Sequence, residues 1–218
     1  MKQSDCGYFP KFLSRRQHYL FVQCERLRKA GVPINLMVFC PAFHEEVEEL
    51  FIHYQLWLAL KWNPKHSFSI CTAENKDSND CIDIINTALL KYDAKSLGVK
   101  GQLKMSLIPK TSEYIFRDTA TNKQIRNNKI RIGSAQEPDN LRGLPGSGAM
   151  FFNIDRWPDS PKAPAEDLVK SITGGVLPRP YTMQVFTTQR LPAGSFARKF
   201  YCDSKDSITR FRAIDILP

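Results

Sequence analysis

Polar side chains follow the end of a strongly apolar segment in the second half of the chain. The run Ala-Met-Phe-Phe at residues 149–152 is bounded by Gly148 on one side and by Asn153 and Asp155 on the other. A short apolar run bounded in this way is typical of a buried strand in a parallel sheet. Ligands of such sheets bind beyond the carboxyl ends of the strands. Asp155 is therefore a candidate to hold a magnesium ion, because this ion prefers carboxylate oxygens.

Strands and helices alternate along the chain, and together they must position these side chains. We predict strands at residues 34–39, 67–73, 103–108, 114–116, 130–134, 149–152, 181–187 and 208–216. Helices are predicted at residues 14–30, 45–58, 75–92, 164–172 and 195–201. Ser14 is a candidate N-cap of the first helix. The alternation predicts an α/β fold with a mainly parallel sheet.

Length and composition limit the classes of protein to which the chain can belong. Its 218 residues, 42% of them hydrophobic, predict one domain over residues 1–218, with an irregular arm at residues 1–13. The six cysteines show no metal-ligand spacing, so no metal site is expected. No segment offers the roughly 20 apolar residues that span a bilayer, and no signal peptide is recognisable. We therefore expect a cytoplasmic protein without a membrane partner.

The balance of charge favours an anionic partner. The formal net charge is +9, and lysines and arginines that neutralise phosphates gain free energy from released counterions. Lys123, Arg126, Lys129 and Arg131 form a basic cluster, and Arg142 lies further along the chain. The cluster and Arg142 are candidates to contact a DNA backbone, although a solvated basic face is the alternative.

Five short motifs follow one another between residues 133 and 159. They are Gly-Ser-Ala at 133–135, Pro-Asp at 138–139, Leu-Arg-Gly at 141–143, an apolar strand with its acid at 150–155, and Trp-Pro-Asp at 157–159. Their order and spacing resemble the ATPase half of the large terminase subunit, the motor that packs double-stranded DNA into the heads of tailed phages. The resemblance implies a P-loop NTPase-like three-layer sandwich. It covers the ATPase half alone, so no nuclease domain is expected in this chain.

Residues 40–47, with the sequence CPAFHEEV, stand where the resemblance implies the Walker A loop, G-x-x-x-x-G-K-[ST]. Cys40 and Glu45 replace the glycines whose backbone amides curl round phosphate. Glu46 replaces the lysine, and Val47 replaces the hydroxyl residue that holds magnesium. A carboxylate about 4 Å from a phosphate repels it by roughly 4 kcal/mol at an effective dielectric constant near 20. The motif is therefore degenerate, and we expect no bound ATP.

The resemblance implies roles for other positions as well. In active terminases the Walker B strand ends in adjacent acids, which would fall two and three residues before Asp155, so the expected base is missing here. Thr187 and Thr188 match the coupling motif that senses the γ-phosphate, although a strand end capped by hydroxyls is the alternative. Gln17 matches the glutamine that reads adenine, or it is a solvated helix residue. The strands that end near Cys40 and Asp155 should lie side by side.

Three functions fit these residues. The first is a terminase-like module of viral DNA packaging that has lost its ATP site and acts as a DNA-binding or assembly subunit. The second is an active packaging ATPase, with ATP and magnesium as cofactors, whose site has unconventional residues or is completed by a partner chain. The third is an unrelated α/β protein. Under the first two, the partners are double-stranded DNA and the portal or other terminase subunits, and the chain can oligomerise.

Overall fold

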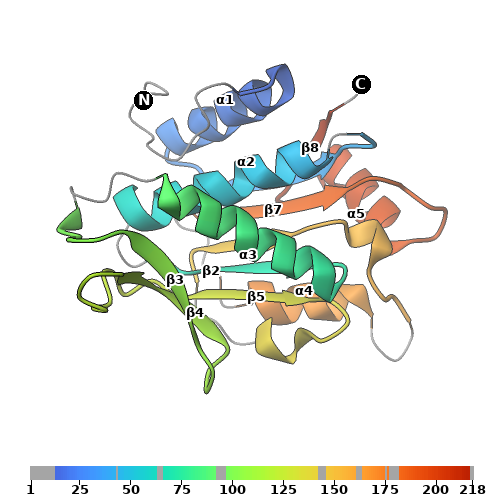
Figure 1. Ribbon diagram of the computed structural model, residues 1–218. Coiled ribbons are helices and arrows are strands. Elements are labelled where there is room, and N and C mark those ends of the chain that lie inside the picture. The colour runs from blue at the N-terminus through green and yellow to red at the C-terminus, as the bar shows by residue number, and fades with distance from the viewer. Residues whose placement is uncertain are drawn as a thin grey trace.

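The computed structural model of the protein contains one eight-stranded sheet with helices on both of its faces (Figure 1). The structure describes residues 13–42, 44–62, 66–91, 97–141, 146–160, 164–174, 176 and 182–216. The irregular arm predicted at residues 1–13 lies, except for its last residue, outside the described residues.

The predicted strands and helices are all present, with bounds that differ by a few residues. The strands are β1 (Ile34–Phe39), β2 (Phe68–Thr72), β3 (Leu103–Ile108), β4 (Glu113–Asp118), β5 (Ile130–Ser134), β6 (Gly148–Phe151), β7 (Met183–Thr188) and β8 (Arg212–Asp215). The α-helices are α1 (Arg15–Lys29), α2 (His44–Trp57), α3 (Asn75–Leu90), α4 (Ala165–Thr173) and α5 (Phe196–Lys205). A π-helical segment, η2 (Leu58–Trp62), follows α2, and η4 (Pro138–Leu141) and η5 (Ile154–Arg156) are short 3-10 helices.

The strands lie in the order β3-β4-β5-β2-β6-β7-β1-β8. Within this order, every pair of neighbouring strands in β5-β2-β6-β7-β1-β8 is parallel. Strand β4 pairs antiparallel with both β3 and β5. The carboxyl ends of the parallel strands therefore meet at one edge of the sheet. The expectation that the strands near Cys40 and Asp155 are neighbours is wrong, because β7 lies between β1 and β6 and pairs with both. Strand order depends on contacts between distant segments, which spacing along the chain does not fix.

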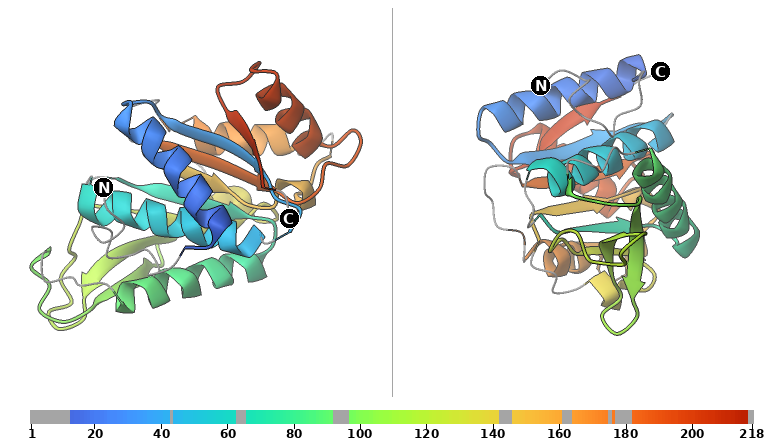
Figure 2. Two further views of the ribbon diagram at one scale, coloured as in Figure 1. Left: turned by 90° about the horizontal axis from the view of Figure 1, so that it is seen from above. Right: turned by 60° about the vertical axis from the view of Figure 1, so that its left-hand side comes forward.

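Each face of the sheet carries its own hydrophobic core. In β1, Leu36 and Val38 pack into the core that α1, α2 and α3 cover, whereas Met37 packs into the core that α4 and α5 cover. Figure 2 shows these two groups of helices on opposite sides of the sheet. The alternation follows from the two-residue period of a strand. It confirms the predicted α/β three-layer sandwich with a mainly parallel central sheet.

Helix α1 begins as predicted and buries a charged pair. Ser14 caps it in a capping box, which satisfies backbone donors of the first turn. Tyr19 is 47% exposed, whereas Arg28 is buried. The Arg28 guanidinium donates to both carboxylate oxygens of Glu25, at 2.8 and 2.9 Å, and the Tyr54 hydroxyl of α2 donates to Glu25 at 2.7 Å. Because α2 covers this side of α1, the charged pair is buried with its hydrogen bonds made.

Candidate functional site

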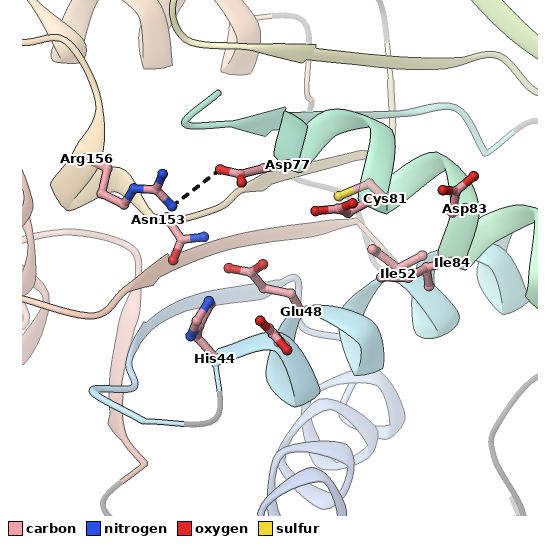
Figure 3. A pocket seen from close by; sticks show the side chains of 11 residues that line it. His44, Glu48, Ile52, Asp77, Cys81, Asp83, Ile84, Asn153 and Arg156 are labelled. Atoms are coloured by element: carbon pink, nitrogen blue, oxygen red, sulfur yellow. Dashed lines mark ion pairs between the residues drawn. The ribbon is translucent and has the colours of Figure 1, made fainter. Parts of the chain in front are cut away.

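A cavity of about 320 Å³ lies where the segment after the carboxyl end of β6 meets the first three turns of α2 and α3. Figure 3 shows side chains from α2, α3 and the segment after β6 converging on it. Its charged lining consists of Glu45, Glu48, Asp77, Asp80, Asp83 and Arg156. Five carboxyl groups and one guanidinium therefore face a space at the position where α/β sheets bind ligands.

The residues that replace Walker A leave β1 and enter α2. The Cys40 backbone N–H donates to the Thr188 carbonyl at 2.9 Å, so the start of the loop is tied to β7. Glu45 is exposed at the start of α2, and Val47 is fully buried in the core. Glu46 is half-buried, and its Oε2 atom has no hydrogen-bond partner among the described residues. At the positions that the resemblance aligns with the Walker A lysine and hydroxyl residue, the chain has the carboxylate of Glu46 and the buried Val47.

Glu48 is a site residue that sequence reasoning did not single out. The Asn153 backbone N–H donates to the Thr187 hydroxyl oxygen, and that hydroxyl donates to Glu48 Oε1, both at 3.0 Å. Burial, with smaller contributions from Asp77 and Glu45, raises the pKa of the Glu48 carboxyl to about 8, against the hydrogen bond from Thr187. Glu48 therefore carries a proton at neutral pH. Its place three residues after Glu45, on the same side of the helix, was the available signal.

The structure brings three of the predicted catalytic positions together across β6 and β7. The Asp155 Oδ1 atom accepts a hydrogen bond from the Gln189 backbone N–H at 3.0 Å and lies 2.9 Å from the Thr188 hydroxyl. That hydroxyl also lies 2.7 Å from the Arg190 carbonyl, and it can donate to one oxygen at a time. Thr187 binds Glu48, as described above. The polar groups at these strand ends thus hold one another.

Asn153 stands where the resemblance implies a Walker B acid. Its backbone has a φ of 53°, a left-handed conformation that asparagine tolerates better than most residues. Its side-chain oxygen accepts a hydrogen bond from the Gln189 amide at 2.8 Å. The side chain at this position therefore supplies no carboxylate and has a partner within the protein.

Arg156 provides the positive charge of the cavity lining. Its guanidinium pairs with Glu74 at 2.6 Å and with Asp77 at 3.5 Å, and Figure 3 shows the second of these pairs. The hydrogen bond to Glu74 raises the pKa of Arg156. The pairing links the segment after β6 to the start of α3. Within the described part of the chain, no group of three or more His, Cys, Asp or Glu side chains could hold a metal ion.

Gln17 is the residue that the resemblance implies as the adenine contact. Both its amide oxygen and its amide nitrogen form hydrogen bonds within the protein. Its oxygen accepts from the Ser14 backbone N–H at 3.0 Å, and its nitrogen donates to the Glu46 carbonyl at 2.9 Å. The side chain is 5% exposed. It therefore caps α1 and joins that helix to the first turn of α2.

The predicted DNA-binding cluster is held by an acid that the sequence does not place beside it. Lys129 and Arg131 both pair with Glu113 of β4, at 2.9 and 3.1 Å. Arg126 lies half-buried, 3.5 Å from the carbonyl of Leu60. Contact of these three residues with DNA stays a prediction. Residue Arg142 lies outside the described residues.

No helix in the described ranges is long and apolar enough to cross a membrane. No protein-family model matches the chain, and no curated protein matches it either. Solved structures do match its fold. The HK97 bacteriophage large terminase gives a TM-score of 0.66 at 11% identity, over 98% of this chain and 43% of that one.

Two further structures agree with this match. The large terminase of a thermophilic bacteriophage, in complex with ATP-gamma-S, gives a TM-score of 0.63 at 12% identity, over 94% of this chain and 45% of that one. The ATPase domain of the Thermus phage P74-26 large terminase gives a TM-score of 0.53 at 15% identity, over 96% of this chain and 82% of that one. The chain therefore has the fold of phage large-terminase ATPase domains, and it spans less than half of the first two of these proteins.

Proposed function

We propose that the protein is a terminase-like module of viral double-stranded DNA packaging that has lost its ATP site and acts as a DNA-binding or assembly subunit. The observation that carries the proposal is the charge of the cavity at the start of α2. Glu45, Asp77, Asp80 and Asp83 line this cavity. Glu46, which the resemblance places at the lysine position, follows Glu45 in α2. Each carboxylate about 4 Å from a phosphate would oppose binding by roughly 4 kcal/mol at an effective dielectric constant near 20.

The hydrogen bonds inside the site support the same conclusion. Gln17 is bonded to α2, Thr187 to Glu48, and Thr188 and Asp155 lie within hydrogen-bond distance of each other. A nucleotide would have to break these contacts before it could use the same groups. The polar side chains of the site therefore bond to one another. On this proposal the protein keeps the fold of an ATPase domain but has lost the groups that bind phosphate.

The fold also suggests the class of partner. The solved structures that share it are large terminases and their ATPase domains, and this chain carries a formal net charge of +9. A basic protein on such a scaffold suits double-stranded DNA, with the portal or other terminase subunits as protein partners. Assembly into an oligomer is part of this proposal.

The second candidate is an active packaging ATPase whose site is completed by unconventional residues or by a partner chain. The observation in its favour is Arg156, which presents a guanidinium to an open cavity. In that case ATP and magnesium would be cofactors. Against it, Arg156 is already paired with Glu74 and Asp77.

Calorimetry with ATP and magnesium, together with a phosphate-release assay, separates the two candidates. The thermophilic phage large terminase that is known in complex with ATP-gamma-S serves as the positive control. We expect no heat of binding and no phosphate release from this protein, with or without duplex DNA. Micromolar binding with turnover would reject the lost site in favour of the active motor. A gel-shift titration with duplex DNA at two salt concentrations tests the DNA-binding part separately.

A further inference from the structure

The outward side of α1 carries a continuous stripe of basic and aromatic side chains. The stripe, here called the α1 outer face, consists of Arg15, His18, Tyr19, Val22, Arg26 and Lys29. These positions follow one another at helical spacings of three, four, seven, eleven and fourteen residues from the first, so they line one side of the helix. Figures 1 and 2 show α1 as the outermost helix on its side of the sheet.

The cations of the α1 outer face are exposed and have no acidic partner in the part of the chain that the structure describes. Arg15, Arg26 and Lys29 are all exposed, and none forms an ion pair with another described residue. The only acid in α1 is Glu25, which is buried and bonded to Arg28 and Tyr54 on the opposite side. The positive charge of this face is therefore available to a partner. By contrast, Lys129 and Arg131 of the basic cluster at residues 123–131 are both held by the buried carboxylate of Glu113.

The spacing of these cations fits a duplex. At 1.5 Å per residue, Arg15 and Arg26 are about 16 Å apart along the helix, and Arg15 and Lys29 about 21 Å. Both separations exceed the width of the major groove, about 12 Å, so the two ends of α1 can reach phosphates on both strands. Tyr19 is 47% exposed between them, and its hydroxyl can donate to phosphate or sugar oxygens.

We propose that the α1 outer face is the surface through which this protein binds the phosphate backbone of double-stranded DNA. The inference rests on the proposed DNA-binding function and assigns it to a surface that the sequence did not indicate. The contacts are to the backbone, so binding is independent of base sequence and depends strongly on salt.

The test compares two variants that lose the same charge. One replaces the α1 cations (Arg15→Gln, Arg26→Gln, Lys29→Gln), and the control replaces three exposed lysines near the other end of the sheet (Lys100→Gln, Lys104→Gln, Lys110→Gln). Glutamine forms helix nearly as well as arginine and lysine, and circular dichroism checks that both variants fold. Fluorescence anisotropy with a labelled duplex measures affinity against salt.

Each phosphate contact contributes about 0.9 to the slope of log affinity against log salt. We therefore expect the α1 variant to lose about 2.7 from this slope, so a fourfold rise in salt should weaken wild-type binding about 40-fold more than variant binding. The control variant should keep most of the wild-type slope. A further variant, Arg15→Lys with Arg26→Lys, keeps the charge and should keep the slope as well.

The outcomes separate this inference from the proposed function. Wild-type protein that binds duplex, with equal slopes for the α1 variant and the control, would overturn the assignment to α1 and leave DNA binding intact. Wild-type protein that binds no duplex would overturn this inference together with the DNA-binding part of the proposed function. Poly-glutamate in place of DNA is the third arm: binding as tight as to duplex, lost in the same variant, would mean that the face receives an acidic protein and would overturn the inference.

Discussion

The protonation of Glu48 makes a prediction about how stability changes with pH. In the unfolded chain this carboxyl ionises near its ordinary pKa of 4.5, whereas burial raises its pKa to about 8 in the folded protein. Between these two values the folded state holds a proton that the unfolded chain has released. The contribution of Glu48 to the free energy of unfolding is therefore fully present below pH 4.5 and is lost as pH rises to about 8.

The size of this loss follows from the two pKa values. Their difference, 8 minus 4.5, at about 1.36 kcal/mol for each pH unit, corresponds to roughly 5 kcal/mol. The Glu48 side chain is half-buried, so water screens part of the penalty, and we expect about 2 kcal/mol in practice. Glu48→Gln removes the titration while its amide oxygen still accepts the hydrogen bond from Thr187. The variant should match wild type near pH 5 and exceed it in stability above about pH 8.

Urea unfolding of wild type and Glu48→Gln from about pH 5 to about pH 9 measures this difference. Subtracting the two curves removes every other titrating group that the proteins share. The variant Glu137→Gln, which loses a carboxyl from an exposed position, provides the baseline for loss of a surface charge. A difference between wild type and Glu48→Gln that does not change with pH, or a wild type that is the more stable protein at alkaline pH, would refute the reasoning.

Three further predictions concern the site and the sheet. Glu46→Ala should leave duplex affinity unchanged in a gel-shift titration, because its Oε2 atom has no partner among the described residues; a loss of binding would show that the carboxylate has a role. Gly148→Ala should destabilise the protein by about 1–3 kcal/mol in thermal unfolding, since the new Cβ would lie 2.6 Å from the Gln55 amide; an unchanged melting temperature contradicts this. Glu113→Gln should cost about 3 kcal/mol in urea unfolding, because the half-buried Arg131 loses its carboxylate partner; a cost near zero would mean that water already screens the pair.

Local patterns in the sequence predicted the elements well. The buried strand at residues 148–151 is evident from its apolar run, and Ser14 marks the start of α1 because a serine hydroxyl can accept a backbone N–H there. Apolar residues at the two-residue period of strands and the helical period of 3.6 likewise predicted the elements, and the resemblance implied their three layers. The elements depend on residues close together in the chain, and they could therefore be predicted from the sequence.

The contents of the site could be predicted only in part. The absence of a lysine at Glu46 and of an acid at Asn153 can be read directly, because it concerns residue types. The two hydrogen bonds that connect Asn153, Thr187 and Glu48 could not be predicted. They join three segments that only the strand order β6-β7-β1 brings together.

The sequence by itself determined which chemical groups the protein has: a strand-and-helix pattern, a net positive charge, and carboxylates at positions that the resemblance aligns with Walker A. Only the tertiary structure decided which of these charges have partners. It buried Arg28 against Glu25 and held Lys129 on Glu113, and within the described residues it placed no acid on the outward side of α1. The reason is physical: the pKa and the availability of a charged group depend on burial and on neighbours within a few ångströms, and those neighbours come from distant parts of the chain.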